Sequence, residues 1–301
     1  MRKTFFARLN EAKWSYLFIA PAVLLFLVFV VGPVIASFYW SFTEYDAMHP
    51  PKWVGLSNYK NIFFNDPRFW QSVRNTVIYT AGVIPVSVAL SLFLAVAVDQ
   101  KIRFKNFFRI VYFIPAITSV IALSVIWKWL FAGGKYGLIN HLLMMAGLRP
   151  VDWLMSPVWT LPAIMIMSVW ASLGYNMILF LSGLQTIPRT VYEAAEIDGA
   201  GTFDKFRYIT LPLLKPTMVF VVIIGLISSF QVFERIYIMT QSESGIGGVL
   251  DSALTVVAYL YDTGFRQFRM GYASALGYII FAVIFTVTII NIKFVKTRVE
   301  Y

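Results

Sequence analysis

The sequence predicts an all-α integral membrane protein with six transmembrane helices and both termini on the cytoplasmic side. Apolar residues make up 59% of its 301 positions and charged residues only 13%, whereas soluble domains average roughly 45–50% and 25%. Six intervals between successive charged residues are long enough to cross a bilayer, which takes about 20 apolar residues. Because six is an even number, the two ends of the chain lie on the same side of the membrane.

The six predicted spans form a single transmembrane domain that covers residues 1–301. Their approximate bounds are 15–41, 75–98, 108–130, 160–182, 216–239 and 270–292. The first span follows a basic segment, as the apolar region of a secretory signal does. It has 30 uncharged residues, however, and a signal's apolar region has about 7–15. We therefore expect an uncleaved span. The uncharged interval 136–148 is too short to cross and predicts a helix at the membrane interface or outside it.

The distribution of basic residues predicts the orientation. Fifteen of the 25 lysines and arginines fall in 1–13, 99–109, 189–215 and 293–301. Cytoplasmic loops of membrane proteins are enriched in such residues, so these segments and both termini are expected in the cytoplasm. This enrichment accounts for the net charge of +10 without a nucleic-acid partner. The chain has no cysteine and two isolated histidines, so no metal site is predicted.

Two further features bear on the spans and the loop between them. Pro85 and Pro115 lie inside the second and third predicted spans, where proline is tolerated in a buried bundle and kinks the helix. The loop 44–74 is rich in aromatic residues and turn formers. It predicts either an aromatic belt at the membrane interface or a surface that docks a partner.

A polar segment, residues 188–216, separates the fourth and fifth predicted spans. Thr190 and Glu193 have the spacing of a capping box, which predicts that a helix begins there. Gly199 and Gly201 are expected to end this helix, since glycine accepts the left-handed backbone of a helix C-terminus. Thr202 is placed to cap a second short helix that ends at Pro212. The segment is therefore predicted to be a pair of helices outside the membrane.

No catalytic motif accompanies these helices. The sequence has no phosphate-binding loop, zinc-protease motif or serine-hydrolase elbow, so we expect a transport subunit without its own ATPase site rather than an enzyme. A metal-dependent membrane enzyme built on Glu193, Glu196, Asp198 and Asp204 is an alternative, but these acids lack basic phosphate partners. An ion-coupled secondary transporter is the other alternative, but such a protein normally carries acidic residues inside the membrane or broken helices in matched halves. The predicted spans are nearly free of charge, so the energy for transport is expected to come from another subunit. The helix pair is then a plausible socket for an energising subunit.

The polar segment resembles the E-A-A motif of the permeases of ATP-binding cassette (ABC) importers. The motif reads E-A-A, G after three residues, and I-x-L-P after nine more. Every position is filled, by Glu193, Ala194, Ala195, Gly199, Ile209, Leu211 and Pro212. Shorter stretches over nearly the whole chain resemble the carbohydrate-uptake branch, namely 55–59, 66–70 with 75–76, 230–233 and 271–275. The sequence departs from that branch at Glu234–Arg235, where a single polar residue is expected, and this leaves the solute unassigned.

The resemblance implies a type I ABC importer permease fold in the bacterial inner membrane. It implies four kinds of partner: a second, similar permease, two cytoplasmic ATPase subunits that use ATP, an extracytoplasmic solute-binding protein and membrane lipid. No cofactor is expected on this chain itself. The ATPase-coupling residues carried over from the motif are Glu193, Ala194, Ala195, Asp198, Gly199, Ala200, Leu211 and Pro212. In this interpretation Glu193 caps its own helix and meets a basic group of the partner, and Gly199 sets the angle between the helices.

The substrate pathway is predicted from polar and aromatic residues within or next to the spans. Amides and hydroxyls bind sugar hydroxyls, and an aromatic ring packs on the apolar face of a sugar. The candidates are Ser172, Asn176, Phe230, Gln231 and Glu234. Hydrogen bonding between helices is an alternative role for each of them. Glu234 and Arg235 are expected to pair with each other or with a partner, or to extend to the interface. The predicted solute is a sugar or a sugar-like compound. A permease for another solute, such as a polyol phosphate, an oligosaccharide or a peptide, is an alternative.

Overall fold

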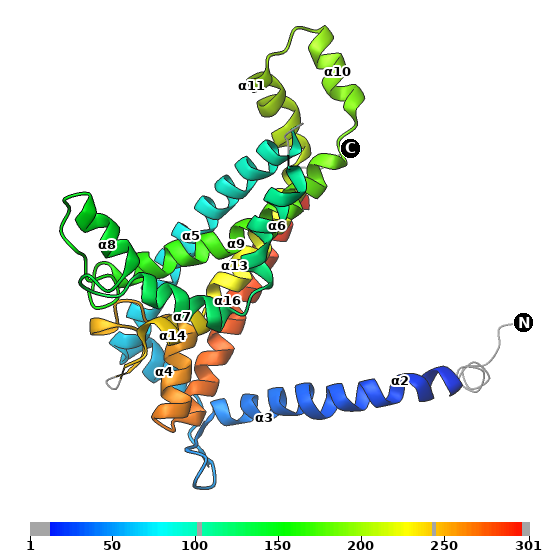
Figure 1. Cartoon of the computed structure of the whole chain (residues 1–301). Coiled ribbons are helices and arrows are strands. Elements are labelled where there is room, and N and C mark those ends of the chain that lie inside the picture. The colour runs from blue at the N-terminus through cyan, green and yellow to red at the C-terminus, as the bar shows by residue number, and fades with distance from the viewer. Residues whose placement is uncertain (1–12, 101–103, 243–244, 297–301) are drawn as a thin grey trace, which may run out of the picture. The chain divides into compact units, whose positions relative to one another are not determined.

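The computed structural model describes residues 13–100, 104–242 and 245–296, which are mainly helical (Figure 1). The predicted positions of the two termini therefore concern residues outside the described chain. Contacts between backbone atoms divide the chain into two compact units. The first consists of Met1–Phe64 and Thr263–Tyr278, and the second of Asn65–Asp262 and Ile279–Tyr301. The prediction of one domain stays a prediction, and the two units are described separately.

The first unit begins with a long apolar helix. It comprises α2 (Lys13–Phe26), a π-helical turn, η1 (Leu27–Val31), and α3 (Gly32–Ser41). A short antiparallel hairpin of β1 (Thr43–Glu44) and β2 (Lys52–Trp53) follows, and then α4 (Ser57–Phe64). The buried amide of Asn58 donates to the carbonyl oxygens of Ser41 and Thr43, at 3.0 and 2.9 Å. This amide joins α4 to the end of α3, so part of the predicted loop 44–74 is an ordered helix.

The second unit is a helical bundle around α5 and α9. Its elements up to α9 are α5 (Pro67–Asp99), α6 (Lys105–Ile117), α7 (Val120–Leu130), α8 (Leu138–Met145) and α9 (Thr160–Gln185). The next are α10 (Arg189–Ile197), α11 (Thr202–Lys205), η2 (Phe206–Thr210), α12 (Leu211–Leu213) and α13 (Lys215–Phe230). The last are α14 (Glu234–Thr240), η3 (Val249–Asp251), α15 (Val256–Tyr261), η4 (Asp262–Arg266) and α16 (Met270–Lys296), of which η4 and α16 contribute to both units.

Helix α5 begins eight residues before the predicted start of the second span. Asp66 is its N-cap, and the Asp66 carboxylate accepts a hydrogen bond from the backbone N–H of Phe69 at 3.1 Å. Pro67 occupies the first helical position, where its missing N–H costs nothing. The local cap therefore adds about two turns ahead of the apolar interval from which the span was predicted.

Small residues allow the helices of the bundle to approach closely. At Gly174 in α9, a Cβ atom would lie 1.9 Å from the carbonyl oxygen of Tyr112 in α6, which is far inside van der Waals contact. The absence of a side chain there lets the two backbones touch. The core at the Asp99 end of α5 is filled by buried side chains of α5, α9 and α13, among them Leu92, Phe180, Leu184, Leu214 and Val221.

The described chain holds four helices that are long and apolar enough to cross a membrane. They are Trp14–Ser41, Pro67–Asp99, Thr160–Gln185 and Met270–Asn291. Two further pairs qualify only when each bent pair is counted as one span, which brings the number to as many as six. In these pairs Lys105–Ile117 meets Val120–Leu130 at 99°, and Thr202–Leu213 meets Lys215–Phe230 at 63°.

The third predicted span, 108–130, consists of two helices, α6 and α7, and not of one kinked helix. The helix breaks at Thr118 and Ser119, which have extended backbone angles, rather than bending at Pro115. The Thr118 hydroxyl donates to the carbonyl oxygen of Ile114 at 2.8 Å. Such side-chain bonds give the backbone an alternative to the regular helix. The fifth predicted span, 216–239, is interrupted as well, because α13 ends at Phe230 and α14 begins at Glu234.

Candidate functional site

The polar segment 188–216, named here the helix pair, projects from the bundle as two short helices (Figure 1). Its first helix, α10, ends in a Schellman motif. Gly199 has a φ of +81°, the Gly199 N–H donates to Glu196 O at 3.1 Å, and the Ala200 N–H donates to Ala195 O at 2.8 Å. These two bonds satisfy carbonyl groups that the helix end leaves open. Gly199 therefore turns the chain, as the sequence predicted.

The caps of the helix pair differ from those predicted. The N-cap of α10 is Pro188, with no side-chain hydrogen bond, so Thr190 is the second helical residue and Glu193 caps nothing. Likewise Thr202 is the first residue of α11, and its N-cap is Gly201. The reason is the extended conformation of Pro188 and Gly201, which lets the helix begin directly after them. The second helical stretch continues past Pro212 to Leu213.

Two polar contacts hold the helices of the pair together. The Tyr192 hydroxyl lies 2.9 Å from Thr210 Oγ1, and Lys205 Nζ lies 2.7 Å from Glu196 Oε1. The side chains of Tyr192, Phe206 and Leu211 pack against the buried core of α5, α9 and α13. The pair is thus anchored at the Asp99 end of α5, beside a pocket of about 210 Å³.

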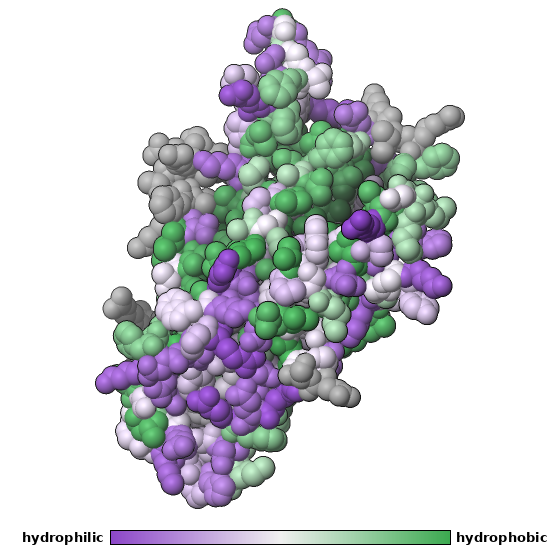
Figure 2. Space-filling model, turned by 90° about the vertical axis from the view of Figure 1, so that its left-hand side faces the viewer, coloured by the Kyte–Doolittle hydropathy of each residue, from purple (hydrophilic) through white to green (hydrophobic). Residues whose placement is uncertain are grey.

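The opposite side of the helix pair is open to solvent. Of the predicted coupling residues, Glu193, Ala194, Asp198, Gly199 and Pro212 are exposed, and Ala195, Ala200 and Leu211 are half-buried. Apolar side chains are exposed beside them: Ile197 is 87% and Phe203 69% accessible. Figure 2 shows hydrophilic residues gathered at the end where the pair lies, next to a hydrophobic expanse over the neighbouring helices. The pair therefore presents a mixed charged and apolar surface that the chain itself leaves uncovered.

The predicted pathway residues lie on α9 and on both sides of the break between α13 and α14. Ser172 donates its hydroxyl to Val169 O of its own helix, at 2.8 Å. Asn176 is half-buried, and its amide has no hydrogen-bond partner within the described residues. Phe230 lines an apolar pocket that contains none of the other four, and Gln231 and Glu234 are exposed. None of the other four lines the pocket at Phe230 or the pocket at Arg235.

Arg235 is the residue that sequence reasoning passed over in favour of its neighbour. Its guanidinium points into the bundle and lines a pocket of about 150 Å³, whereas the Glu234 side chain is exposed. The expected ion pair between the two is not formed in the structure, in which Arg235 has no ion pair with any described residue. The unusual Glu234–Arg235 pair was the sequence signal for a charged group in the bundle. Which of the two residues points into the bundle depends on where α14 begins.

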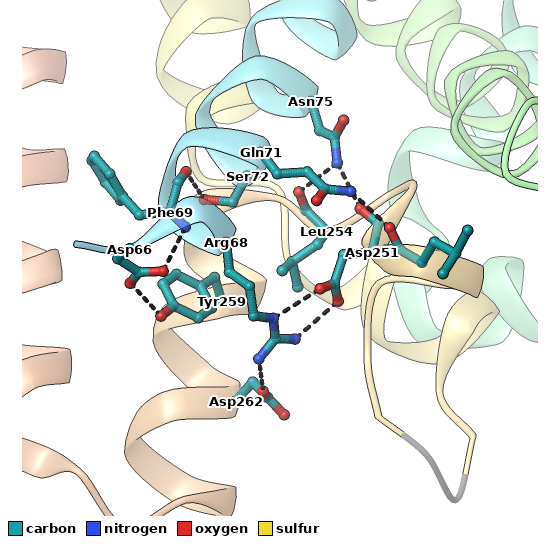
Figure 3. A network of polar contacts seen from close by, with 11 residues as sticks. Asp66, Arg68, Phe69, Gln71, Ser72, Asn75, Asp251, Leu254, Tyr259 and Asp262 are labelled. Carbon is teal, nitrogen blue, oxygen red and sulfur yellow. Dashed lines mark hydrogen bonds and ion pairs between the residues drawn. The ribbon is translucent and has the colours of Figure 1, made fainter. Parts of the chain in front are cut away.

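A second polar cluster, the Arg68 network, lies at the Pro67 end of α5 (Figure 3). The Arg68 guanidinium binds both oxygens of Asp251, at 2.8 and 2.9 Å, and Asp262 at 3.3 Å. Four further hydrogen bonds belong to the network: Asn75 Nδ2 to Asp251 O at 2.8 Å and to Leu254 O at 3.0 Å, Gln71 Nε2 to Leu250 O at 2.7 Å, and the Tyr259 hydroxyl to Asp66 at 2.5 Å. It ties the segment that follows α14 to the start of α5.

Asp46 and His49 line a pocket of about 410 Å³ in the first unit. The His49 imidazole lies 2.7 Å from the Asp46 carboxylate, which also accepts the backbone N–H groups of His49 and Met48. These hydrogen bonds hold the pKa of Asp46 well below its usual range. No group of three or more potential metal ligands occurs within the described residues.

The broken helices and the projecting helix pair define an integral membrane transport subunit. The chain belongs to the family of inner membrane components of binding-protein-dependent transport systems, whose family model matches residues 87–301. It is accordingly a multi-pass protein of the bacterial inner membrane and an ABC transporter permease.

Two relatives extend the similarity over almost the whole chain. One is the arabinooligosaccharides transport system permease protein AraP of Bacillus subtilis, strain 168. It is 38% identical over 279 residues, which cover 92% of this chain and 87% of the relative. The other is the lactose transport system permease protein LacF of Rhizobium radiobacter, 36% identical over 270 residues, with 88% of each chain covered.

The fold is also that of a solved transporter. A chain in the crystal structure of a bacterial ABC transporter involved in the import of the acidic polysaccharide alginate superposes with a TM-score of 0.86. The superposition covers 98% of this chain and 99% of that one, at 21% sequence identity. The chain therefore has the type I ABC permease fold.

Proposed function

We propose that this chain is the permease subunit of an ABC importer for a sugar or sugar-like solute, and that its helix pair couples it to a separate ATPase. The complete transporter consists of this chain, a second homologous permease, two cytoplasmic ATPase subunits and an extracytoplasmic solute-binding protein. Each bent helix pair counts as one span, giving six, with both termini and the helix pair in the cytoplasm. ATP is used by the partner subunits, and this chain binds no cofactor.

The observation that carries the proposal is the construction of the helix pair. Its inner side packs on the core shared by α5, α9 and α13 through Tyr192, Phe206 and Leu211. Its outer side exposes Glu193, Ala194 and Ile197. A force applied to the exposed side is thereby transmitted to three long helices through packed side chains. A surface with small, charged and apolar groups side by side suits a protein partner.

The sugar class is supported by the relatives, whose names assign arabinooligosaccharides and lactose to them. The pathway residues Ser172, Asn176, Phe230, Gln231 and Glu234 are proposed to contribute hydroxyl, amide, carboxylate and ring contacts along the route. A permease for another solute, or an ion-coupled transporter, remains a distinct outcome of the experiment below.

The experiment compares Glu193→Lys with wild type in vesicles that contain the complete transporter. We expect ATP-driven saccharide uptake to be lost while the permease stays in the membrane, because the substitution reverses a charge at the docking surface. Glu44→Lys, a charge reversal at an exposed glutamate in β1, is the control and should leave uptake near wild type. Normal uptake in Glu193→Lys would contradict the assignment of the helix pair. Uptake abolished by ionophores but independent of ATP would instead identify a secondary transporter.

A further inference from the structure

A pocket of about 150 Å³ lies where the broken helices of the second unit meet. It is lined by Pro115, Ala116, Thr118, Val120, Leu123, Ala171, Tyr175 and Arg235. Pro115 to Val120 are the residues of the break between α6 and α7, and Arg235 follows the break between α13 and α14. Irregular backbone at membrane depth is tolerated where it lines a cavity or is buried in protein. Both breaks are explained if they open this pocket, named here the Arg235 pocket.

One nitrogen of the Arg235 guanidinium is held by a chain of hydrogen bonds. Its Nη1 donates to the Tyr79 hydroxyl oxygen at 3.5 Å, Tyr79 donates to Ser168 Oγ at 2.7 Å, and Ser168 donates to Ile164 O at 2.7 Å. Tyr79 is only 1% accessible and Ser168 is fully buried, so this chain of hydrogen bonds has a fixed direction. Nη1 of the guanidinium is thereby directed at Tyr79, and its other edge, Nε and Nη2, takes no part in this chain of hydrogen bonds.

That remaining edge has no acceptor in the described part of the chain. Arg235 Nε is buried without a hydrogen-bond partner, and no described carboxylate lies within 4.0 Å of the guanidinium. The Nε–Nη2 edge of an arginine matches the two oxygens of a carboxylate and binds them through parallel hydrogen bonds. The Arg235 guanidinium, which lines the pocket, therefore has an edge, unsatisfied among the described residues, of the kind that binds a carboxylate.

The Arg235 guanidinium lies within the helical bundle, where a charge without a counter-ion is unfavourable in free energy. Ser168, to which Tyr79 connects it, lies eight residues after the first residue of α9, which is about 12 Å along the helix. A buried cation without a counter-ion is strongly destabilising, and charged groups inside a membrane bundle mark substrate pathways or pair with other charges. We therefore expect an anion from outside this chain to compensate the charge of Arg235.

We propose that Arg235 selects a saccharide bearing a carboxylate, such as a uronic acid, by binding that carboxylate in the Arg235 pocket. The inference rests on the proposed function and names the substrate class of the pathway. The half-exposed ring of Tyr175 lines the same pocket and provides a flat surface for the apolar face of the sugar. A carboxylate of the second permease would satisfy the same edge, and the experiment separates these two sources.

The test measures ATP-driven uptake by the complete transporter in proteoliposomes, with the same solute-binding protein throughout. The probes are three matched pairs of labelled disaccharides, built on galacturonate and galactose, glucuronate and glucose, and mannuronate and mannose. We expect wild type to take up a uronate member at least tenfold faster than its neutral counterpart. Arg235→Gln should lose at least tenfold of the uronate uptake and so lower this ratio, and Arg235→Lys should retain part of it.

The matched control is Arg109→Gln. Arg109 is also a half-buried arginine whose Nε has no partner, but it lies in α6 and does not line the pocket. It should leave the uronate-to-neutral ratio at the wild-type value whatever it does to the overall rate.

Three results would overturn the inference. Equal uptake of both members of every pair by wild type would show that Arg235 does not select an acidic sugar, while the proposed function stands. Equal loss of both members in Arg235→Gln, with the second permease no longer copurifying, would show that Arg235 pairs with that subunit. Failure of wild type to take up any saccharide with ATP would contradict the proposed function and the inference with it.

Discussion

The two ends of α5 are held by opposite kinds of contact. At the Pro67 end, the polar groups of the Arg68 network bind one another. Arg68 binds Asp251 and Asp262, and the side-chain amides of Gln71 and Asn75 bind backbone carbonyl groups of Leu250 and Asp251 (Figure 3). At the Asp99 end, the helix pair has one hydrogen bond and one ion pair between its helices and exposes most of its charged and apolar side chains.

The strained backbone at the Pro67 end shows what the network does. Leu250 and Asp251 both have a φ of +55°, a conformation that costs non-glycine residues about 1–3 kcal/mol each. Gln71, Asn75 and Arg68 bind these two residues directly. In the helix pair, the left-handed position is a glycine, Gly199, and needs no such support. One end stabilises a fixed shape, and the other leaves its binding groups free for a partner.

The largest expected effect tests the Asp99 end. A Cβ at Gly199 meets nothing within 4 Å, but valine at a φ of +81° is strained by about 1–2 kcal/mol. The Schellman turn should open and α10 should change direction. We expect ATP-driven uptake to fall at least tenfold in vesicles, with the melting temperature of the permease nearly unchanged.

Gly147→Val is the matched control for this prediction. Gly147 has a φ of +76° and also has nothing within 4 Å of its Cβ position, but it follows α8 and lies outside the helix pair. It should show similar strain and near wild-type uptake. An equal loss of uptake in both variants would mean that backbone strain anywhere in the chain, and not the turn of the helix pair, disrupts transport.

The next prediction tests the Pro67 end through stability. Arg68→Met removes the bidentate pair with Asp251 and the ion pair with Asp262, whose side chain is 8% accessible. Arg68 itself is 39% accessible, so the expected loss lies between those of exposed and buried pairs, about 2 kcal/mol in the free energy of unfolding. Thermal unfolding in detergent should show a lower midpoint, and uptake should fall only in proportion to the folded fraction.

A double-mutant cycle with Asp251→Asn separates the ion pair from other effects of Arg68→Met. Residues in direct contact show coupling energies of about 0.5–3 kcal/mol, and we expect a value within this range for Arg68 and Asp251. Additive effects of the two substitutions would show that the network does not stabilise the Leu250 turn through this pair.

The sequence predicted the helix pair better than the bundle that carries it. The spacing from Glu193 to Gly199 and Pro212 is local, and Gly199 ends α10 for a local reason, its left-handed backbone. The caps were misplaced by one or two residues. Pro188 takes the N-cap position without a side-chain hydrogen bond, and at Gly201 the backbone N–H donates to the Asp204 carboxylate at 3.3 Å.

The helix breaks and the inward cation could not be predicted from composition. Intervals without charge indicate apolar length, but the turn at Thr118 and Ser119 depends on a side-chain hydrogen bond and on the helices packed around it. Which of Glu234 and Arg235 points inward depends on the register of α14, and that register depends on where α13 ends. The helix break and the register of α14 are tertiary effects. The length of an uncharged interval does not reveal either of them.

A smaller effect is expected at the contact between the two helices of the pair. Tyr192→Phe removes the hydrogen bond to Thr210 and keeps the packing of the ring on the core. A hydrogen bond of this kind contributes about 0.5–1.5 kcal/mol, so uptake should fall a few-fold. Tyr208→Phe is the control, because the Tyr208 side chain is exposed and should tolerate the change. If the two variants behave alike, the Tyr192 hydroxyl does not orient the helix pair.

The smallest effect is expected from Lys205→Gln, which removes the ion pair with Glu196. The carboxylate side chain is 61% accessible, and exposed pairs contribute about 0–1 kcal/mol because water and salt screen them. Uptake should change by less than twofold, and raising the salt concentration should remove even that difference. A loss as large as that of Gly199→Val would reverse the comparison between the two ends of α5. It would mean that the Asp99 end, like the Arg68 network, depends on charges bound within the chain, and that its ionic groups are not free for a partner.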